Sequence, residues 1–152
     1  MIVYLDTSAV VKLVVEEPGS DLAARLWDAA DVRITSLVTY AEARAALAAA
    51  RRDRRTTAGA SAAAAVQLEA RWSECTKVGV SEPLVHDAGN LADAERLRGY
   101  DAVHLASALR ADARDLIVAT WDTALGDAAT RMGLTVAPAA VPVRPHLREG
   151  HP

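Results

Sequence analysis

Unbroken apolar runs alternate along this chain with segments of helical periodicity. Residues 1–5 read Met-Ile-Val-Tyr-Leu and end at Asp6, and residues 115–120 form a second apolar run shortly before Asp122. A strand without polar alternation is covered on both faces, as in a parallel sheet, whereas residues 37–52 and 101–112 have the length and periodicity of buried helices. The pattern therefore predicts an α/β fold around a central parallel sheet.

The rest of the chain continues this alternation. Shorter strands are expected at residues 31–36, 76–80 and 134–137. Helices are expected after the first strand, after Ser20 and Thr56 or Thr57 as capping residues, from Ser81, and between residues 123 and 132. Alanine-rich helices on either side of residue 55 can pack closely as a hairpin. The prediction is one three-layer α/β/α domain over residues 1–138 with a protruding helical hairpin, followed by a proline-rich tail at residues 139–152.

Composition narrows the class of protein. A length of 152 residues suits a single domain, and one cysteine, Cys75, allows no disulfide within the chain. No apolar window approaches the roughly 18 residues of a membrane span, so a cytoplasmic protein is expected. The net charge of −3 argues mildly against a polyanionic partner, but 17 basic residues face only 16 acidic ones once the four acids discussed next are set aside.

Four carboxylates occupy similar places relative to the predicted elements. Asp6 and Asp122 follow the two most hydrophobic strands, Asp101 begins a buried-looking helix, and Glu42 lies in the first turns of the helix after the second strand. Ligands of doubly wound parallel sheets bind beyond the carboxyl ends of the strands. All four acids are therefore expected on the ligand-binding side of the sheet.

These acids have two interpretations. Aspartate before a helix is a preferred N-cap, and Thr39-x-x-Glu42 fits a capping box. Capping does not require the four acids to lie close together. If they do, carboxylates about 5 Å apart repel by roughly 3 kcal/mol per pair at an effective dielectric near 20. A converging cluster therefore predicts a divalent cation, and hard oxygen ligands favour Mg²⁺ or Mn²⁺, which can activate water for phosphodiester hydrolysis.

The motifs around these acids resemble those of a known family. Asp6-Thr7-Ser8, Glu42 in TYAEARAAL, Asp101 in YDAVHLASAL and Asp122 in TWDTALGDAATRMGLTV resemble the PIN-domain ribonucleases, in particular VapC-type toxins, over roughly residues 1–138. The resemblance implies Mg²⁺- or Mn²⁺-dependent cleavage of single-stranded or loop RNA, a homodimer and a cognate VapB-type antitoxin. Carried over by position, it implies the catalytic residues Asp6, Glu42, Asp101 and Asp122, the metal ligands Asp6, Asp101 and Asp122, and the supporting residues Thr7, Ser8 and Thr120.

Other features leave alternatives open. The basic run Arg51, Arg52, Arg54 and Arg55 either binds the RNA backbone or is a solvated helix end that favours the helix dipole. His104, three residues after Asp101, is more often a packed, hydrogen-bonded residue than a ligand or base. Nucleotide-binding glycine motifs are absent from the sequence. The alternative to a nuclease is a catalytically weak PIN-like module that binds RNA or a partner protein.

Overall fold

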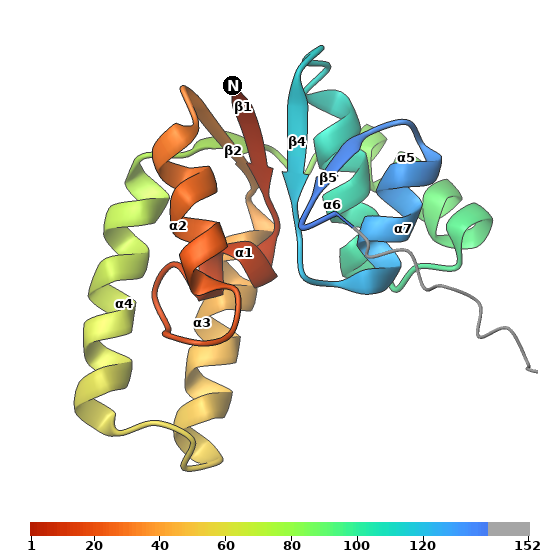
Figure 1. Cartoon of the computed structure of the whole chain (residues 1–152). Helices are drawn as coiled ribbons and strands as arrows, with labels where there is room; N and C mark the ends of the chain where they lie inside the picture. Colours follow the sequence, from red (N-terminus) through yellow and green to blue (C-terminus); the bar gives the residue numbers. More distant parts are fainter. Residues whose placement is uncertain (140–152) are drawn as a thin grey trace, which may run out of the picture.

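The computed structural model describes residues 1–139, and they form a five-stranded parallel sheet with helices on both faces (Figure 1). The strands lie in the order β3-β2-β1-β4-β5, and every neighbouring pair is parallel. Their bounds are β1 (Ile2–Leu5), β2 (Val32–Ser36), β3 (Thr76–Val78), β4 (Leu116–Ala119) and β5 (Thr135–Ala137). The predicted α/β class and central parallel sheet are confirmed.

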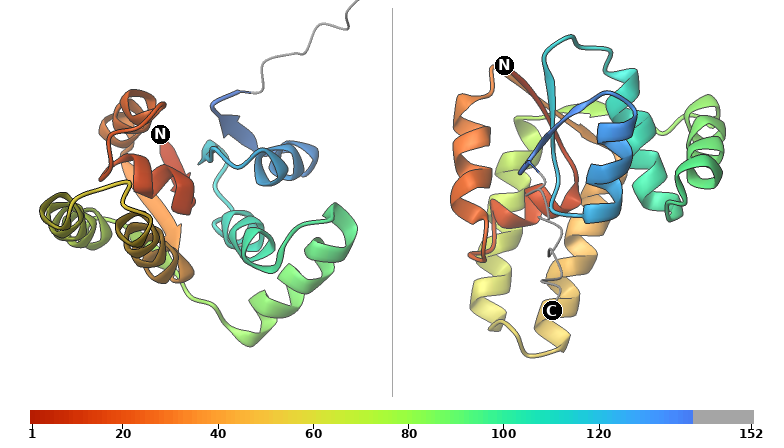
Figure 2. Two further views of the ribbon diagram at one scale, coloured as in Figure 1. Left: turned by 90° about the horizontal axis from the view of Figure 1, so that it is seen from below. Right: turned by 45° about the vertical axis from the view of Figure 1, so that its right-hand side comes forward.

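The helices form two layers, one on each side of the sheet (Figures 1 and 2). The layer beside β1 and β2 contains α1 (Thr7–Lys12), α2 (Ser20–Ala29), α3 (Val38–Arg52) and α4 (Ala58–Ser73). The other layer contains α5 (Glu82–Glu95), α6 (Gly99–Arg110) and α7 (Thr123–Arg131). Helices α3 and α4 extend beyond the carboxyl ends of the strands as the predicted hairpin (Figure 1).

The side chains of β1 point alternately to the two faces of the sheet, although every residue of the strand is apolar or aromatic. Val3 and Leu5 pack with α1 to α4, whereas Tyr4 packs on the opposite face with β2, β4 and α6, and all three are fully buried. Because side chains along a strand point alternately to opposite faces, a strand covered on both sides has no polar position. This burial explains why the first five residues lack polar alternation.

The strand order has a switch point between β1 and β4. The chain steps from β1 outward through β2 to β3, returns to β4 on the other side of β1, and continues to β5. Leu5 and Ala119 are paired at the ends of these two central strands. Chain segments leaving β1 and β4 therefore diverge to opposite layers, the arrangement at which α/β sheets bind ligands.

Some local predictions are confirmed and others are wrong. Thr57 and Ser81 cap α4 and α5 by accepting hydrogen bonds from backbone N–H groups three residues later. The expected capping role of Ser20 is wrong: Gly19 is the N-cap of α2, and the Ser20 hydroxyl instead donates to the carbonyl oxygen of Val15.

The capping box predicted at the start of α3 is also wrong. Leu37 is the N-cap and makes no side-chain capping bond, while Thr39 is fully buried and accepts a hydrogen bond from the Thr35 hydroxyl at 2.8 Å. Glu42 is thereby left free of any capping role at this helix. The lone Cys75 is buried, which raises the pKa of its thiol to about 11, in agreement with a packed rather than a nucleophilic side chain.

Two further expectations concern the limits of the domain. Among residues 1–139, no helix combines the length and apolarity that crossing a membrane requires. The predicted tail, residues 139–152, lies outside the described residues except for Ala139.

Gly19 allows the loop before α2 to contact the segment after β4. Its φ of +97° lies in the left-handed region, and a Cβ placed there would lie 2.5 Å from Nε1 of Trp121. The ammonium of Lys12 lies 5.3 Å from the centre of the same indole ring. Trp121 thus packs against the α1–α2 side of the sheet.

Replacing Gly19 with alanine should destabilise the protein by about 1–3 kcal/mol, because a non-glycine residue is strained in the left-handed region and its Cβ would clash with Trp121. Gly89, exposed in the middle of α5 with open space around it, is the matched control. Gly89→Ala should stabilise the helix by about 0.5–1 kcal/mol. Urea unfolding followed by circular dichroism measures both, and equal effects would contradict the proposed packing.

Candidate active site

Asp6 lies directly after β1 and is almost completely buried. Its Oδ1 accepts hydrogen bonds from the Ala9 backbone N–H at 2.9 Å and from the Ser8 hydroxyl at 2.6 Å. Its Oδ2 accepts from the Thr120 hydroxyl at 2.5 Å. Burial raises the pKa of Asp6, and the bonds from Ser8 and Thr120 oppose that rise. Asp6 is therefore both the N-cap of α1 and the acceptor at which three donors meet.

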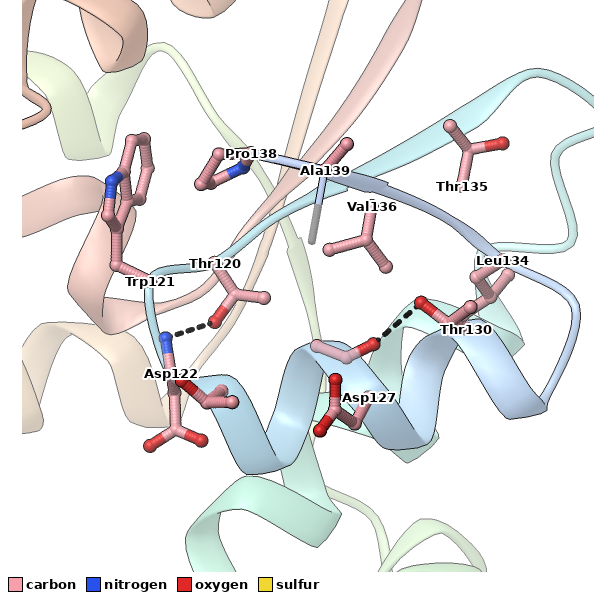
Figure 3. A pocket seen from close by; sticks show the side chains of 12 residues that line it. Thr120, Trp121, Asp122, Asp127, Thr130, Leu134, Thr135, Val136, Pro138 and Ala139 are labelled. Carbon is pink, nitrogen blue, oxygen red and sulfur yellow. Dashed lines mark hydrogen bonds between the residues drawn. The ribbon is translucent and has the colours of Figure 1, made fainter. Parts of the chain in front are cut away.

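The hydroxyls that bind Asp6 also hold the segment between β4 and α7. Ser8 accepts a hydrogen bond from the Trp121 backbone N–H at 2.8 Å, and Thr120 accepts one from the Asp122 backbone N–H at 3.0 Å (Figure 3). Each of these hydroxyls in turn donates a hydrogen bond to Asp6. Two hydroxyl bridges, Ser8 to the Trp121 N–H and Thr120 to the Asp122 N–H, therefore fix the backbone of this segment relative to Asp6.

Asp122 and Asp101 approach each other from the N-terminal ends of α7 and α6. Asp122 caps α7 through Oδ1, which accepts from the Leu125 N–H at 2.9 Å, and Asp101 lies in the first turn of α6. The guanidinium of Arg98 lies 3.3 Å from Oδ2 of Asp101 and 3.6 Å from Oδ2 of Asp122. The Arg98 guanidinium therefore bridges the two carboxylates.

The electrostatics of Asp101 reflect this proximity. Burial is the largest cause of the rise in its pKa, the negative charge of Asp122 is the second, and Arg98 acts in the opposite direction. The Arg98 side chain is 85% exposed, so solvent screens its effect. Arg98 therefore offsets only part of the effect that burial and Asp122 have on the pKa of Asp101.

Glu42 joins this edge from α3, where a different set of donors holds it. Its Oε1 accepts a hydrogen bond from the Thr7 hydroxyl at 2.7 Å and lies 2.7 Å from Nε2 of His104. Partial burial alone would raise the pKa of Glu42, but the bonds from His104 and Thr7 hold the pKa below its usual range. Glu42 is therefore a carboxylate near neutral pH.

The four predicted acids thus lie in linked groups at the carboxyl ends of the strands. Asp6 is connected to the Asp122 backbone through Thr120, Asp122 is connected to Asp101 through Arg98, and Glu42 is held separately by Thr7 and His104. Within residues 1–139, no three His, Cys, Asp or Glu side chains form a group compact enough to hold a metal ion. Each carboxylate instead has protein donors as partners, and the predicted ligand set of Asp6, Asp101 and Asp122 stays a prediction.

Sequence reasoning missed Arg98 and the partner of His104. Arg98 precedes Asp101 by three residues, a spacing at which helical side chains meet, and this spacing could have signalled the ion pair. His104 is only 2% exposed and hydrogen-bonded at both ring nitrogens, so the prediction of a packed residue is confirmed. The carboxylate that it contacts is nevertheless Glu42, from another helix.

The predicted RNA-binding arginines lie away from the acids. Arg51, Arg52, Arg54 and Arg55 are exposed at the tip of the α3–α4 hairpin. Nine residues of helix, roughly 14 Å at 1.5 Å per residue, separate Glu42 from Arg51. The arginines could therefore contact a chain that also reaches the acids, but they do not belong to the acidic site.

A pocket of about 510 Å³ opens beside Asp122, between α7 and β5 (Figure 3). Asp127, in α7 directly after Gly126, lines this pocket together with Thr120 and Thr130. The acidic edge is thus continuous with a partly polar depression large enough for a small ring system.

The matches to known proteins agree with this geometry. The PIN domain family model matches residues 3–130, most of the described chain. This chain belongs to the PIN domain family. Ribonuclease VapC49 of Mycobacterium tuberculosis is 46% identical over 138 residues, which cover 91% of this chain and 96% of that protein.

Solved structures share the PIN fold. The crystal structure of VapC20 from Mycobacterium tuberculosis, a Sarcin-Ricin loop cleaving toxin, matches with a TM-score of 0.62 and 23% identity, covering 83% of this chain and 94% of that one. VapBC-1 from nontypeable Haemophilus influenzae matches with a TM-score of 0.60 and 17% identity, covering 90% and 96%. At these identities the likeness supports the fold alone.

The ion pairs around Asp101 can be tested by NMR titration of its carboxyl group. Asp122→Asn should lower the pKa of Asp101 because it removes a nearby negative charge, and Arg98→Ala should raise it because it removes a positive one. Arg25→Ala, which breaks an exposed ion pair on α2, should leave this pKa unchanged. An Asp101 that does not respond to Asp122→Asn would show that the two carboxylates are not close.

Proposed function

We propose that this PIN-domain protein is a divalent-metal-dependent endoribonuclease and the toxin of a toxin–antitoxin pair. The observation that supports the proposal is a chain of contacts at the switch point between β1 and β4. Thr120 links Asp6 to the backbone of Asp122, and Arg98 contacts both Asp122 and Asp101. The family and the 46% identity to a protein named as a ribonuclease, over nearly the full length of both, support the same activity.

A divalent cation suits the donors at this edge. Arg98 already places positive charge between Asp101 and Asp122, and Asp6 retains an unused lone pair on Oδ2 beyond its bond with Thr120. These hard oxygen donors suit Mg²⁺ or Mn²⁺, with Asp6, Asp101 and Asp122 as the holding residues. When bound, such an ion lowers the pKa of a water molecule and neutralises charge developing on a phosphate.

The protein's own groups then have separate roles. Asp6 and the two hydroxyls that donate to it, Ser8 and Thr120, fix the relative position of β1 and the start of α7. Glu42, kept as a carboxylate by Thr7 and His104, accepts the proton of the attacking water. Thr7 thus supports Glu42, while Ser8 and Thr120 support Asp6.

The partners follow from the same assignment. The substrate is RNA, and the arginines at the hairpin tip bind its phosphates at a distance from the acids. The protein partner is a VapB-type antitoxin, because its structural neighbours include complexes such as VapBC-1. Assembly as a homodimer stays a prediction.

Cleavage of a panel of structured RNAs with Mg²⁺ or Mn²⁺ tests the activity. Asp6→Asn and Asp101→Asn should each lower the rate at least about 100-fold, because several kcal/mol of charge stabilisation are lost. Both variants should fold, since asparagine also caps helices and Asp101 is not a cap. Asp21→Asn, at an exposed ion pair on α2, should cleave normally.

The outcome distinguishes the nuclease from a catalytically weak binding module. Equal activity of the wild type, Asp6→Asn and Asp101→Asn would eliminate the proposed mechanism. Thermal melts with EDTA and with Mn²⁺ provide a second measurement: the ion should stabilise the wild type and have little effect on Asp101→Asn.

The hairpin arginines can be tested through the salt dependence of RNA binding. Arg51→Ala combined with Arg52→Ala should weaken binding and reduce the salt slope by up to roughly 1.4, or about 0.7 for each lost phosphate contact with single-stranded RNA. Fluorescence anisotropy against salt concentration measures both quantities. Arg25→Ala combined with Arg110→Ala removes the same charge elsewhere. An equal loss of binding in this control would show that the tip arginines act only through the net charge of the protein.

A further inference from the structure

His104 lies where three elements meet beside the acidic site. It projects from α6, is 2% exposed, and contacts Tyr4 of β1 and Glu42 of α3 through its two ring nitrogens. Thr7 of α1 lies 3.2 Å from the same Nε2 that faces Glu42. Three parts of the chain that are distant in sequence, around residues 4–7, 42 and 104, therefore meet at one buried imidazole.

The contacts determine the tautomer of this imidazole. A carboxylate only accepts hydrogen bonds, so the 2.7 Å contact between Nε2 and Oε1 of Glu42 requires the proton on Nε2. In the neutral ring Nδ1 is then an acceptor, and the Tyr4 hydroxyl, 2.8 Å away, donates to it. Burial raises the pKa of Tyr4 well above its usual value, so this hydroxyl keeps its proton. The direction of donation runs from Tyr4 through His104 to Glu42.

Glu42 is held asymmetrically as a result. Within residues 1–139, the protein hydrogen bonds to this carboxylate both end on Oε1, one from Thr7 and one from His104. The side chain is 27% exposed, and among these residues Oε2 has no protein hydrogen-bond partner. A carboxylate fixed at one oxygen presents the other in a defined direction.

We propose that His104, anchored by Tyr4, is a positioning residue that fixes Glu42 by Oε1 and thereby aims Oε2 at the water consumed in RNA hydrolysis. The inference rests on the proposed function for its chemistry, but the positioning itself is a property of the protein alone. His104 does not contact the substrate, and it acts only through Glu42.

The decisive variants separate positioning from packing. His104→Leu removes both hydrogen bonds, Tyr4→Phe removes only the donor to Nδ1, and His104→Gln offers an amide N–H that can reach Oε1. His104→Leu and Tyr4→Phe should lower kcat about tenfold or more and about threefold, respectively, with KM and Mn²⁺ affinity measured by calorimetry unchanged within twofold. His104→Gln should recover most of kcat. His86→Gln, an exposed histidine on α5, is the control.

Two NMR measurements test the inference without cleavage. Long-range ¹H–¹⁵N spectra should show His104 protonated at Nε2 only, and side-chain relaxation should show Glu42 more mobile in His104→Leu than in the wild type or His104→Gln. A rigid Glu42 in His104→Leu, a proton on Nδ1, or a loss of kcat that His104→Gln does not repair would overturn the proposal. Failure of the wild type to cleave RNA would instead refute the proposed function and leave these NMR criteria to decide the positioning.

Discussion

The buried carboxylate of Asp6 is the interaction on which the site depends. It stands at the end of the central strand and receives the Ala9 N–H together with the hydroxyls of Ser8 and Thr120. A buried carboxylate without such donors would be strongly destabilising. The same hydroxyls accept from the backbone after β4, so satisfying one charge also joins the two central strands where they diverge. The hydrogen bonds that stabilise the buried charge therefore also fix the segments that lead from β1 and β4 to the two helical layers.

The parallel order of the sheet explains why such a solution is needed. With β1 and β4 adjacent and pointing the same way, their following segments emerge together, although 114 positions separate Asp6 from Thr120 in sequence. Helices α6 and α7 then bring Asp101 and Asp122 to that edge with their N-termini, whose partial positive charge favours carboxylates. Arg98 offsets part of the repulsion within the pair. The strand order brings the carboxylates to one edge of the sheet, and nearby hydrogen-bond donors and Arg98 stabilise their negative charge.

The apolar run at residues 1–5 was enough to predict a buried central strand, because burial on both faces leaves no other composition for it. The positions of the four acids at the carboxyl ends followed from the same reasoning. Their partners did not. His104 is three residues from Asp101, yet it bonds Glu42 of α3, because α6 packs against β2 and its His104 side chain lies between Tyr4 and Glu42. Ser20 has the right chemistry for a cap, but Gly19, in the left-handed region beside Trp121, takes the capping position one residue earlier.

Capping and chemistry are compatible roles for these acids, because a carboxylate has two oxygens. Asp122 caps α7 with Oδ1 while Oδ2 lies toward Arg98, and Asp6 receives the capping N–H on Oδ1 while Oδ2 bonds Thr120. A cap contributes about 0.5–2 kcal/mol, which offsets part of the roughly 3 kcal/mol by which two carboxylates about 5 Å apart repel. Structural use of one oxygen also fixes the direction of the other. For Asp6 and Asp122, the hydrogen bonds that stabilise the helix ends are thus the same ones that orient the carboxylates.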